Sequence, residues 1–501
     1  MPKFPDGAFL EAIGLDRESG ALLHVQIYEN LRKLIISGML SSGMRLPSSR
    51  VLMVELGVSR TTVRHAFDRL IAEGYLFSHR GSGTRVAPQC NDALILPKSA
   101  GETAGTTTPL TPARLSARGD RIAGATAIRG YSHARPFVPS IPGLDQFPHK
   151  TWARVLARQW HRHDDGTMGY GELAGYLPLR KAIATYLVIA RGIICNWEQV
   201  VIVAGAQQAF GLIANMLLDP GDSVWVEEPG YSGANGAFVA SGLNLVPVPV
   251  DEYGLNVQAG VALAPHARLA LITPSHQLPL GMVMPVARRL EVLDWARRTD
   301  AWVIEDDYDS EFRYTGRPLS ALQGLDQYGR TIYVGTFSKV LFPSLRLGYL
   351  VTPPNLSDQF ASANGLILKG PPTHLQAAVA EFMTDGHFAR HIRRMRKIYK
   401  ERQQVVLASA QAHLGGLLDV SPSDSGMHVI GWLANDVDDR AVSEAAAKRG
   451  IEITPLSSCY QGKAPRNGLL LGFASSPPDK LRKGIVELAS AIREVAGPTP
   501  A

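Results

Sequence analysis

The first part of the chain alternates between helical spacing and short strand-like runs. Ser48 or Ser49 can cap a helix that ends at Gly57, and Ser59 can cap a second helix. The apolar positions of the second helix recur every three or four residues, at Val63, Ala66, Phe67, Leu70 and Ile71. The following run, EGYLFSHRGSGTRV, predicts two strands joined by a Gly-Ser-Gly turn. The pattern therefore predicts helix, tight turn, helix and hairpin.

The later part of the chain alternates apolar strand-like runs with longer helical stretches. The runs are VVIVAG, SVWVEEP, ARLALITPS, AWVIEDDY and TIYVGTFS. Such alternation predicts an α/β domain with a mostly parallel sheet. A Thr-, Gly- and Pro-rich segment, which predicts a flexible linker, separates the two patterns. We therefore predict domains at residues 17–88 and 131–495, joined by a linker at 89–130.

Length and composition support a globular protein of several domains. The chain has 501 residues, of which 45% are hydrophobic and 19% charged. No apolar run is long enough to cross a bilayer, and the N-terminus has no secretory signal pattern, so we expect a cytoplasmic protein without membrane contact. The cysteines are widely spaced, so neither a disulfide nor a metal site is expected: Cys90, Cys195 and Cys459.

Positive charge is concentrated near the N-terminus. Residues 17–88 hold ten Lys or Arg against five Asp or Glu, which is most of the net charge of +6. A basic segment on a near-neutral chain indicates a polyanion partner, although a solvated surface is the alternative. The first turn of the second predicted helix is basic and rich in hydroxyl groups, as in helix-turn-helix proteins that present this turn to base edges.

Three motifs in this region resemble the winged-helix domain of GntR-type bacterial regulators. They are LPSSR, LGVSRTTVRHAFDRL and EGYLFSHRGSGTRV, and they cover about residues 20–87. The resemblance implies a winged helix-turn-helix domain that binds double-stranded operator DNA. Its implied DNA-contacting residues are Arg50, Ser59, Arg60, Thr61, Thr62, Arg64, Arg80, Gly81 and Gly83.

The residues around Lys339 suit the binding of pyridoxal phosphate. A carboxylate pair, Asp306 and Asp307, ends an apolar strand, where α/β sheets bind ligands. Lys339 follows 33 residues after Asp306, just past another strand, and a lysine amine there can form a Schiff base with the cofactor. Groups suited to a phosphate flank this lysine or open a helix after a strand: Thr336, Ser338, Arg346, Ala206 and Gln207.

These features together resemble the fold-type-I aminotransferases. The resemblance implies a large α/β domain with a small C-terminal α+β subdomain from about residue 380. It makes Lys339 the catalytic lysine and Asp306 the partner of the pyridine nitrogen, with Asp307 as the rival. The remaining implied cofactor contacts are Tyr308 at the ring hydroxyl, Tyr231 stacked on the ring, and Tyr170 lent to a neighbouring subunit.

Two departures from the aminotransferase pattern concern substrate recognition. Leu278 occupies the usual asparagine position, whose role His276 or Gln277 can take over. Leu470 occupies the position of the arginine that normally binds the α-carboxylate, and Arg466 is a candidate substitute at an effector site. We therefore expect the chain to bind pyridoxal phosphate with little or no enzymatic turnover.

A GntR-type head, a linker and an aminotransferase-like domain resemble the MocR family of bacterial transcription regulators. The resemblance implies a head-to-tail homodimer in which the large domain senses pyridoxal phosphate or an amine effector and controls operator binding. The carboxylate-arginine departure favours pyridoxal phosphate over an ω-amino acid as the effector. Two alternatives are an active aminotransferase with an accessory head, and a DNA-binding protein whose large domain only dimerises.

Overall fold

The computed structural model describes residues 13–79, 83–88, 114–124, 135–162, 165–316, 320–434 and 436–497. The chain forms two compact units, residues 1–113 and residues 114–501.

The first unit is a small helical domain with a hairpin. Its elements are α2 (Leu23–Ile36), α3 (Ser49–Leu56), α4 (Arg60–Ala72), β1 (Leu76–His79) and β2 (Gly83–Val86). The predicted helix caps are present, since Ser48 Oγ accepts from Val51 N at 3.3 Å and Ser59 Oγ accepts from Thr62 N at 3.1 Å. Gly57 ends α3 in the left-handed conformation, with a φ of 60°. The strands pair antiparallel, with Leu76 opposite Val86.

The apolar face of α4 packs against α2 and the hairpin. Val63 and Leu70 are fully buried, as are Leu31 of α2 and Leu52 of α3. Ile71 was predicted on the same face but is 38% exposed, because it lies at the edge of the apolar stripe near the end of α4. The helix pattern is therefore confirmed, with a narrower buried face than the sequence indicates.

An eight-stranded sheet forms the centre of the second unit. Its order is β3 (Val200–Val203), β10 (Gly348–Val351), β9 (Thr331–Thr336), β8 (Trp302–Asp307), β7 (Leu269–Ile272), β4 (Ser223–Glu228), β5 (Asn244–Asp251) and β6 (Gly254–Leu255). The five strands from β9 to β5 run parallel, whereas β10 and β6 pair antiparallel with their neighbours. The predicted mostly parallel α/β sheet is confirmed.

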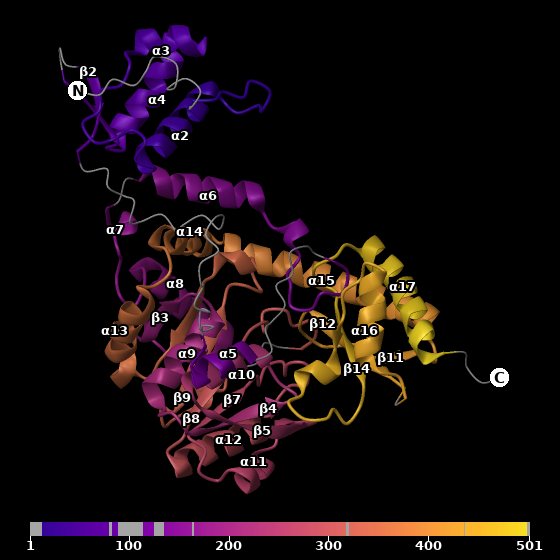
Figure 1. Cartoon of the computed structure of the whole chain (residues 1–501). Coiled ribbons are helices and arrows are strands. Elements are labelled where there is room, and N and C mark those ends of the chain that lie inside the picture. Colours follow the sequence, from indigo (N-terminus) through magenta and orange to yellow (C-terminus); the bar gives the residue numbers. More distant parts are fainter. Residues whose placement is uncertain are drawn as a thin grey trace. The chain divides into compact units, whose positions relative to one another are not determined.

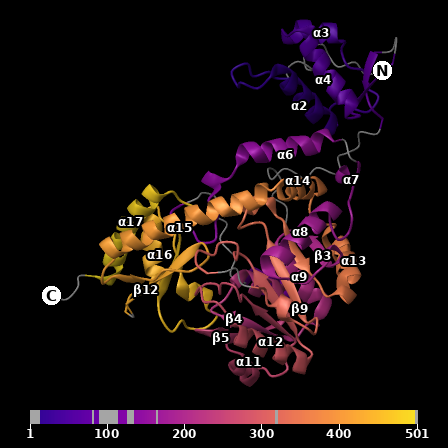
Figure 2. The same ribbon diagram turned by 180° about the vertical axis from the view of Figure 1, so that it is seen from behind.

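Helices cover both faces of this sheet. One face packs on α9 (Ala206–Leu217), α10 (Ser232–Ser241) and α13 (Ser357–Leu368), through Phe210, Phe238 and Phe360. The other face is covered by α6 (His149–His161), α8 (Leu177–Arg191), α11 (Val257–Leu263), α12 (Val286–Thr299) and α14 (Thr373–Thr384). Figure 1 shows α9 and α10 over the strands, and Figure 2 shows α11 and α12 beside β4 and β5. Successive residues of a strand therefore face different helical layers.

The C-terminal part of the second unit has its own sheet and core. The sheet order is β11 (Leu418–Val420), β12 (His428–Leu433), β14 (Gly468–Gly472) and β13 (Thr454–Pro455), all antiparallel. It packs with α15 (His387–His413), α16 (Asp439–Lys448) and α17 (Pro478–Ala496), which gather on one side of Figure 1. This is the small α+β part that the aminotransferase resemblance implies.

Two shorter helices also belong to the second unit. They are α7 (Asp165–Met168) and α5 (Ala117–Gly124), and α5 falls within the predicted linker, residues 89–130. Helix α5 contacts α10, and Arg118 Nε donates to the carbonyl of Ala240 at 2.7 Å. Over the ranges that the structure describes, no helix has the length and apolar composition of a membrane span.

Candidate functional site

Strand β8 ends in two carboxylates that face opposite sides of the sheet. Asp307 accepts a hydrogen bond from Tyr333 Oη at 2.6 Å and pairs with Arg191 Nη2 at 2.7 Å. Asp306 alternates with it and shares the face of Ile304, which belongs to the α9 and α10 layer. Burial first, and then the nearby carboxylates of Asp307 and Glu227, raise the pKa of Asp306 to about 8. Burial therefore favours the neutral form of Asp306, and a nearby cation favours its ionised form.

Lys339 lies just beyond the end of β9 and points into the same region. Its Nζ donates a hydrogen bond to the carbonyl of Ser140 at 2.9 Å. Burial lowers its pKa to about 8, and the charges of Asp309 and Asp306 offset part of this effect. An amine with a lowered pKa loses its proton readily, which a nucleophilic lysine requires.

The start of α9 and the guanidinium of Arg346 form a cradle suited to an anion. Gly205 is the N-cap of α9 with a φ of 96°, and Ala206 is its first residue. A Cβ atom at Gly205 would lie 4.0 Å from Arg346 Cζ, so the guanidinium lies next to the start of α9. Free N–H groups at a helix start and an arginine are the usual ligands of a phosphate.

The predicted hydroxyl and amide groups around this cradle differ in how they are used. Thr336 Oγ1 accepts a hydrogen bond from Ser338 N at 3.1 Å, which fixes the turn before Lys339. Gln207 is exposed, and its Nε2 donates to the carbonyl of Gly233 at 2.5 Å. The backbone at the start of α9 therefore remains the better candidate ligand than the Gln207 side chain.

Tyr231 is close enough to Asp306 and Arg346 for both charges to affect its pKa. It is the N-cap residue of α10 and contacts the ring of Phe210. Burial and then the charge of Asp306 raise its pKa to about 12, and the charge of Arg346 offsets part of this effect. Its pKa responds to both groups, so the structure brings Tyr231, Asp306 and Arg346 together, as the sequence predicted.

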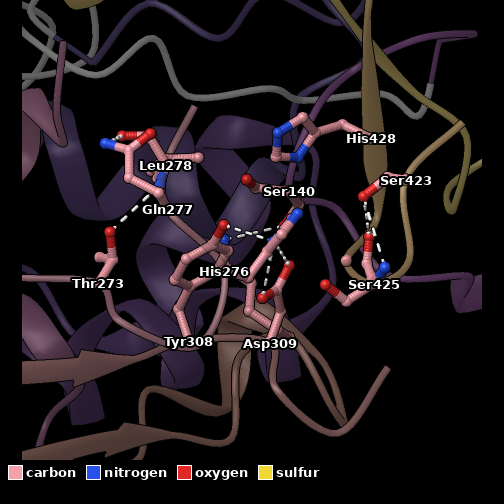
Figure 3. A network of polar contacts seen from close by, with 12 residues as sticks. Ser140, Thr273, His276, Gln277, Leu278, Tyr308, Asp309, Ser423, Ser425 and His428 are labelled. Atoms are coloured by element: carbon pink, nitrogen blue, oxygen red, sulfur yellow. Dashed lines mark hydrogen bonds and ion pairs between the residues drawn. The ribbon is translucent and has the colours of Figure 1, made fainter. Parts of the chain in front are cut away.

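A polar network surrounds Tyr308 on the side of Lys339 (Figure 3). Tyr308 Oη lies 2.9 Å from His276 Nδ1, which is also 3.2 Å from each carboxylate oxygen of Asp309. Gln277 is committed elsewhere, because its Nε2 donates to the carbonyls of Pro229 and Leu278. Of the two residues that could replace the missing asparagine, His276 is the one that contacts Tyr308.

Several residues of this region had no clear signal in the sequence. Ser140 contributes a backbone carbonyl, so its residue type predicts nothing. Asp309 stands in the same motif as Asp306 and Tyr308, and its position one residue past Tyr308 could have been a signal. Arg191 and Tyr333 were missed because they come from α8 and β9, far from Asp307 in the sequence.

Two predicted residues lie away from Lys339 in this chain. Tyr170 is 84% exposed, and Lys369 Nζ is 4.8 Å from its ring centre. The guanidinium of Arg466 lies 4.8 Å over the ring of Trp432 and lines an open groove of about 800 Å³ between α15, β11 and β12. The hydrogen-bond partner of Lys339 and the charged groups around Asp306 are not among the residues that line this groove.

Leu470 is in the middle of β14, opposite Ile430 of β12. Its side chain is 3% exposed and packs in an apolar cluster with Leu456 and Leu280. The position that holds a carboxylate-binding arginine in aminotransferases is therefore part of a small hydrophobic core.

In the first unit, the start of α4 carries the predicted DNA-contacting side chains. Arg60, Thr61 and Arg64 are exposed, and Arg50 of α3 is exposed as well. The hydroxyl groups of Ser59 and Thr62 lie 2.7 Å apart, so the cap of α4 uses both of them. Gly83 begins β2, whereas Arg80 and Gly81 lie outside the described residues.

Family models match both units. Residues 23–86 match the bacterial regulatory proteins of the gntR family, and residues 142–486 match aminotransferase class I and II.

Solved structures resemble the second unit. The kynurenine aminotransferase of Pyrococcus horikoshii, in complex with PMP, is 28% identical with a TM-score of 0.67, covering 74% of this chain and 95% of that one. The α-aminoadipate aminotransferase LysN of Thermus thermophilus is 26% identical with a TM-score of 0.70, covering 76% and 98%.

Several curated proteins match nearly the whole chain. The "Probable rhizopine catabolism regulatory protein MocR" of Rhizobium meliloti is 42% identical over 95% of both chains. The "HTH-type pyridoxine biosynthesis transcriptional regulator PdxR" of Corynebacterium glutamicum is 32% identical over 96% of this chain and 98% of its own. With a gntR-family domain followed by an aminotransferase class I and II domain, this chain belongs to the MocR-type transcription regulators.

Proposed function

We propose that this regulator binds pyridoxal 5′-phosphate at Lys339 and that pyridoxal phosphate or an amine effector at this site controls operator binding by the DNA-binding head, residues 17–88. The observation that carries the proposal is the environment of Lys339, whose pKa is lowered to about 8 beside Asp306 and the anion cradle. Nothing in a DNA-binding protein that merely dimerises requires a buried amine of this kind.

The residues of the site fit this cofactor. The cradle between Gly205 and Arg346 would take the phosphate, with Ala206, Thr336 and Ser338 beside it. Asp306 would hold the proton on the ring nitrogen, because a cationic ring stabilises the ionised form of this buried carboxyl group. Tyr231 would cover the ring face, and Tyr308 with His276 would contact the ring hydroxyl. When bound, the cofactor supplies an aldehyde that reacts reversibly with amines and a ring that withdraws electrons.

The head is proposed to bind double-stranded DNA through the start of α4. Arg60 and Arg64 present two exposed cations on one face of the helix, as major-groove readers do. Ser59 and Thr62 would contribute mainly by fixing the helix start, since their hydroxyl groups bond to each other. Arg50 and Gly83 remain proposed backbone contacts, together with Arg80 and Gly81.

We further propose that two chains form a head-to-tail homodimer in the cytoplasm. Tyr170 and its neighbours Met168 and Leu173 are large apolar residues that are 84%, 72% and 55% exposed. Such exposure in one stretch indicates an interface. In the dimer, Tyr170 would reach the phosphate site of the partner subunit.

The experiment is a visible absorbance spectrum of the purified full chain after incubation with pyridoxal phosphate and dialysis. We expect a visible band at about one cofactor per chain that Lys339→Ala abolishes and that Lys397→Ala, an exposed lysine of α15, leaves unchanged. An unchanged spectrum in Lys339→Ala would overturn the proposal. Sustained turnover between an amino acid and a keto acid would instead favour an active aminotransferase, which Leu470 argues against.

A further inference from the structure

Two buried histidines beside Lys339 each have one ring nitrogen without a hydrogen-bond partner. His276 and His428 are both 2% exposed, and their ring centres lie 5.4 Å apart. Within the described part of the chain, His276 Nε2 and His428 Nδ1 accept or donate no hydrogen bond. Buried polar groups are normally paired, so two such nitrogens on neighbouring rings indicate a ligand. Lys339 is close enough to His428 for its charge to lower the pKa of this histidine, and Figure 3 labels both rings together with Ser140, whose carbonyl binds Lys339.

The partners of the other two ring nitrogens define what these free nitrogens can do. His276 Nδ1 lies 2.9 Å from Tyr308 Oη and 3.2 Å from both oxygens of the Asp309 carboxylate. Because an ionised carboxylate can only accept and the phenol oxygen can also accept, we place the ring proton on Nδ1. His428 Nε2 lies 2.9 Å from the carbonyl of Pro279 and carries the proton there. Burial, and then the nearby His276, lower the pKa of His428 to about 4, so this ring is neutral at pH 7. In neutral rings the remaining nitrogens, His276 Nε2 and His428 Nδ1, are hydrogen-bond acceptors.

Two glycines lie close to the edge of the His276 ring, where a side chain would crowd it. Gly281 and Gly426 have φ angles of 84° and 83°, which other residues rarely adopt. A Cβ atom at Gly281 would lie 3.3 Å from His276 Nε2, and one at Gly426 would lie 2.0 Å from His276 Cε1 and 2.8 Å from Nε2. A side chain at either position would therefore press on the free acceptor.

The charge around these acceptors disfavours a carboxylate. Two lone pairs repel an anion, and Asp306 and Asp309 add negative charge near Lys339. The position of the usual carboxylate-binding arginine is Leu470, which is buried among apolar residues. The same acceptors attract O–H donors, and each can take one.

We propose that the effector site selects a primary amine that carries two hydroxyl groups and no carboxylate, with one hydroxyl donating to His276 Nε2 and the other to His428 Nδ1. The inference rests on the proposed function, because the amine is placed by the cofactor site at Lys339. It assigns His276 and His428 as specificity-determining residues.

The test compares two probes that differ only in the group in question. The full chain loaded with pyridoxal phosphate is titrated with 2-amino-1,3-propanediol and, separately, with each enantiomer of serine, in which a carboxylate replaces one CH₂OH group. Dissociation constants are read from the change in the visible absorbance of the bound cofactor. We expect the diol to bind at least about ten-fold more tightly than either serine, because it donates one more hydrogen bond and carries no carboxylate for the two acceptors to repel.

Variants test whether His428 and Leu470 determine the preference for the diol over serine. His428→Phe should reduce it to less than about three-fold, whereas His413→Phe, an exposed histidine of α15, should preserve it. Leu470→Arg should shift the preference toward serine. Equal or tighter serine binding by the wild-type chain overturns the proposal, as does a preference that His428→Phe retains, or no response to the diol.

The comparison of the diol with serine uses the wild-type chain, so it does not depend on whether any variant folds. Loss of the Lys339-dependent absorbance would contradict the proposed function itself. A normal absorbance without the diol preference would contradict only this inference.

Discussion

Arg191 and Asp307 form an ion pair of 2.7 Å in which both side chains are at most 5% exposed. Tyr333 donates a second hydrogen bond to the same carboxylate oxygen, Asp307 Oδ2. The neighbouring carboxyl of Asp306 faces the other side of β8, toward Tyr231 and the start of α9. The two acids therefore have separate roles, Asp307 in holding α8 to the sheet and Asp306 at the proposed cofactor site.

Substitution of the two aspartates by asparagine separates these roles. Asp307→Asn leaves the buried Arg191 guanidinium without its counter-charge and should lower the free energy of unfolding by about 3–5 kcal/mol. Asp306→Asn resembles the neutral form that burial favours, so the apo protein should keep its stability but lose bound cofactor. Chemical denaturation and the visible spectrum measure the two effects. Normal cofactor retention in Asp306→Asn would contradict the assignment.

Gly205 is predicted to be essential for the anion cradle. Gly205→Ala places a methyl group toward Arg346 and strains a backbone with a φ of 96°, so pyridoxal phosphate affinity should fall. The matched control is Gly211→Ala in the same helix, where the new Cβ atom meets nothing within 4 Å. This control should stabilise α9 by about 0.5–1 kcal/mol. Dialysis of both variants against buffer without cofactor compares their retention.

The buried amine of Lys339 gives the apo protein a characteristic pH dependence. Its folded pKa of about 8 lies below the unfolded value of 10.5, so the unfolded chain binds more protons between these pH values. Its cost to stability, on the order of 3 kcal/mol, therefore applies below pH 8 and is relieved as pH rises toward 10.5. Lys339→Met removes the cost, so the variant should be more stable than wild type at pH 7, with the difference shrinking by pH 10. Thermal unfolding at both values measures it, and a difference independent of pH would contradict the burial of the charged amine.

Arg64 is predicted to read operator DNA directly. Arg64→Ala should weaken binding to the operator by about 1–3 kcal/mol and leave the visible spectrum unchanged. Arg69 of the same helix is the control, because it pairs with Glu73 at 3.0 Å and lies over the ring of Tyr28. Fluorescence anisotropy with duplexes that the full chain selects from a random pool provides the measurement. If Arg64→Ala and Arg69→Ala weaken operator binding equally, the loss reflects the general positive charge and contradicts direct reading by Arg64.

Local patterns in the sequence were sufficient for much of the fold. Serine caps and Gly57 specified the helices of the head, because capping depends only on neighbouring residues. The apolar runs specified the parallel strands, and the motif spacing predicted Asp306 and Lys339 as site residues, which the fold brings within electrostatic reach of each other. Helix α5 was not predicted, because its helical form comes with contacts to α10, which is distant in the sequence.

The parts of the site that depend on distant segments were not predictable. Ser140 acts through its backbone carbonyl, and the pairing of Arg191 with Asp307 joins elements 116 positions apart. Arg466 was predicted near the effector because it precedes β14, yet Trp432 holds its guanidinium by a ring contact on the small sheet. His428 was not considered, because only folding brings β12 beside His276.

Dependence of operator binding on pyridoxal phosphate tests the central claim most directly. Binding of the full chain to its selected duplex is measured at fixed salt over a range of pyridoxal phosphate concentrations, for wild type and Lys339→Ala. We predict that the dissociation constant of the wild type, or the length of DNA it protects, changes as the cofactor saturates, whereas Lys339→Ala shows no change. Identical DNA binding by both proteins at every cofactor concentration would contradict the claim.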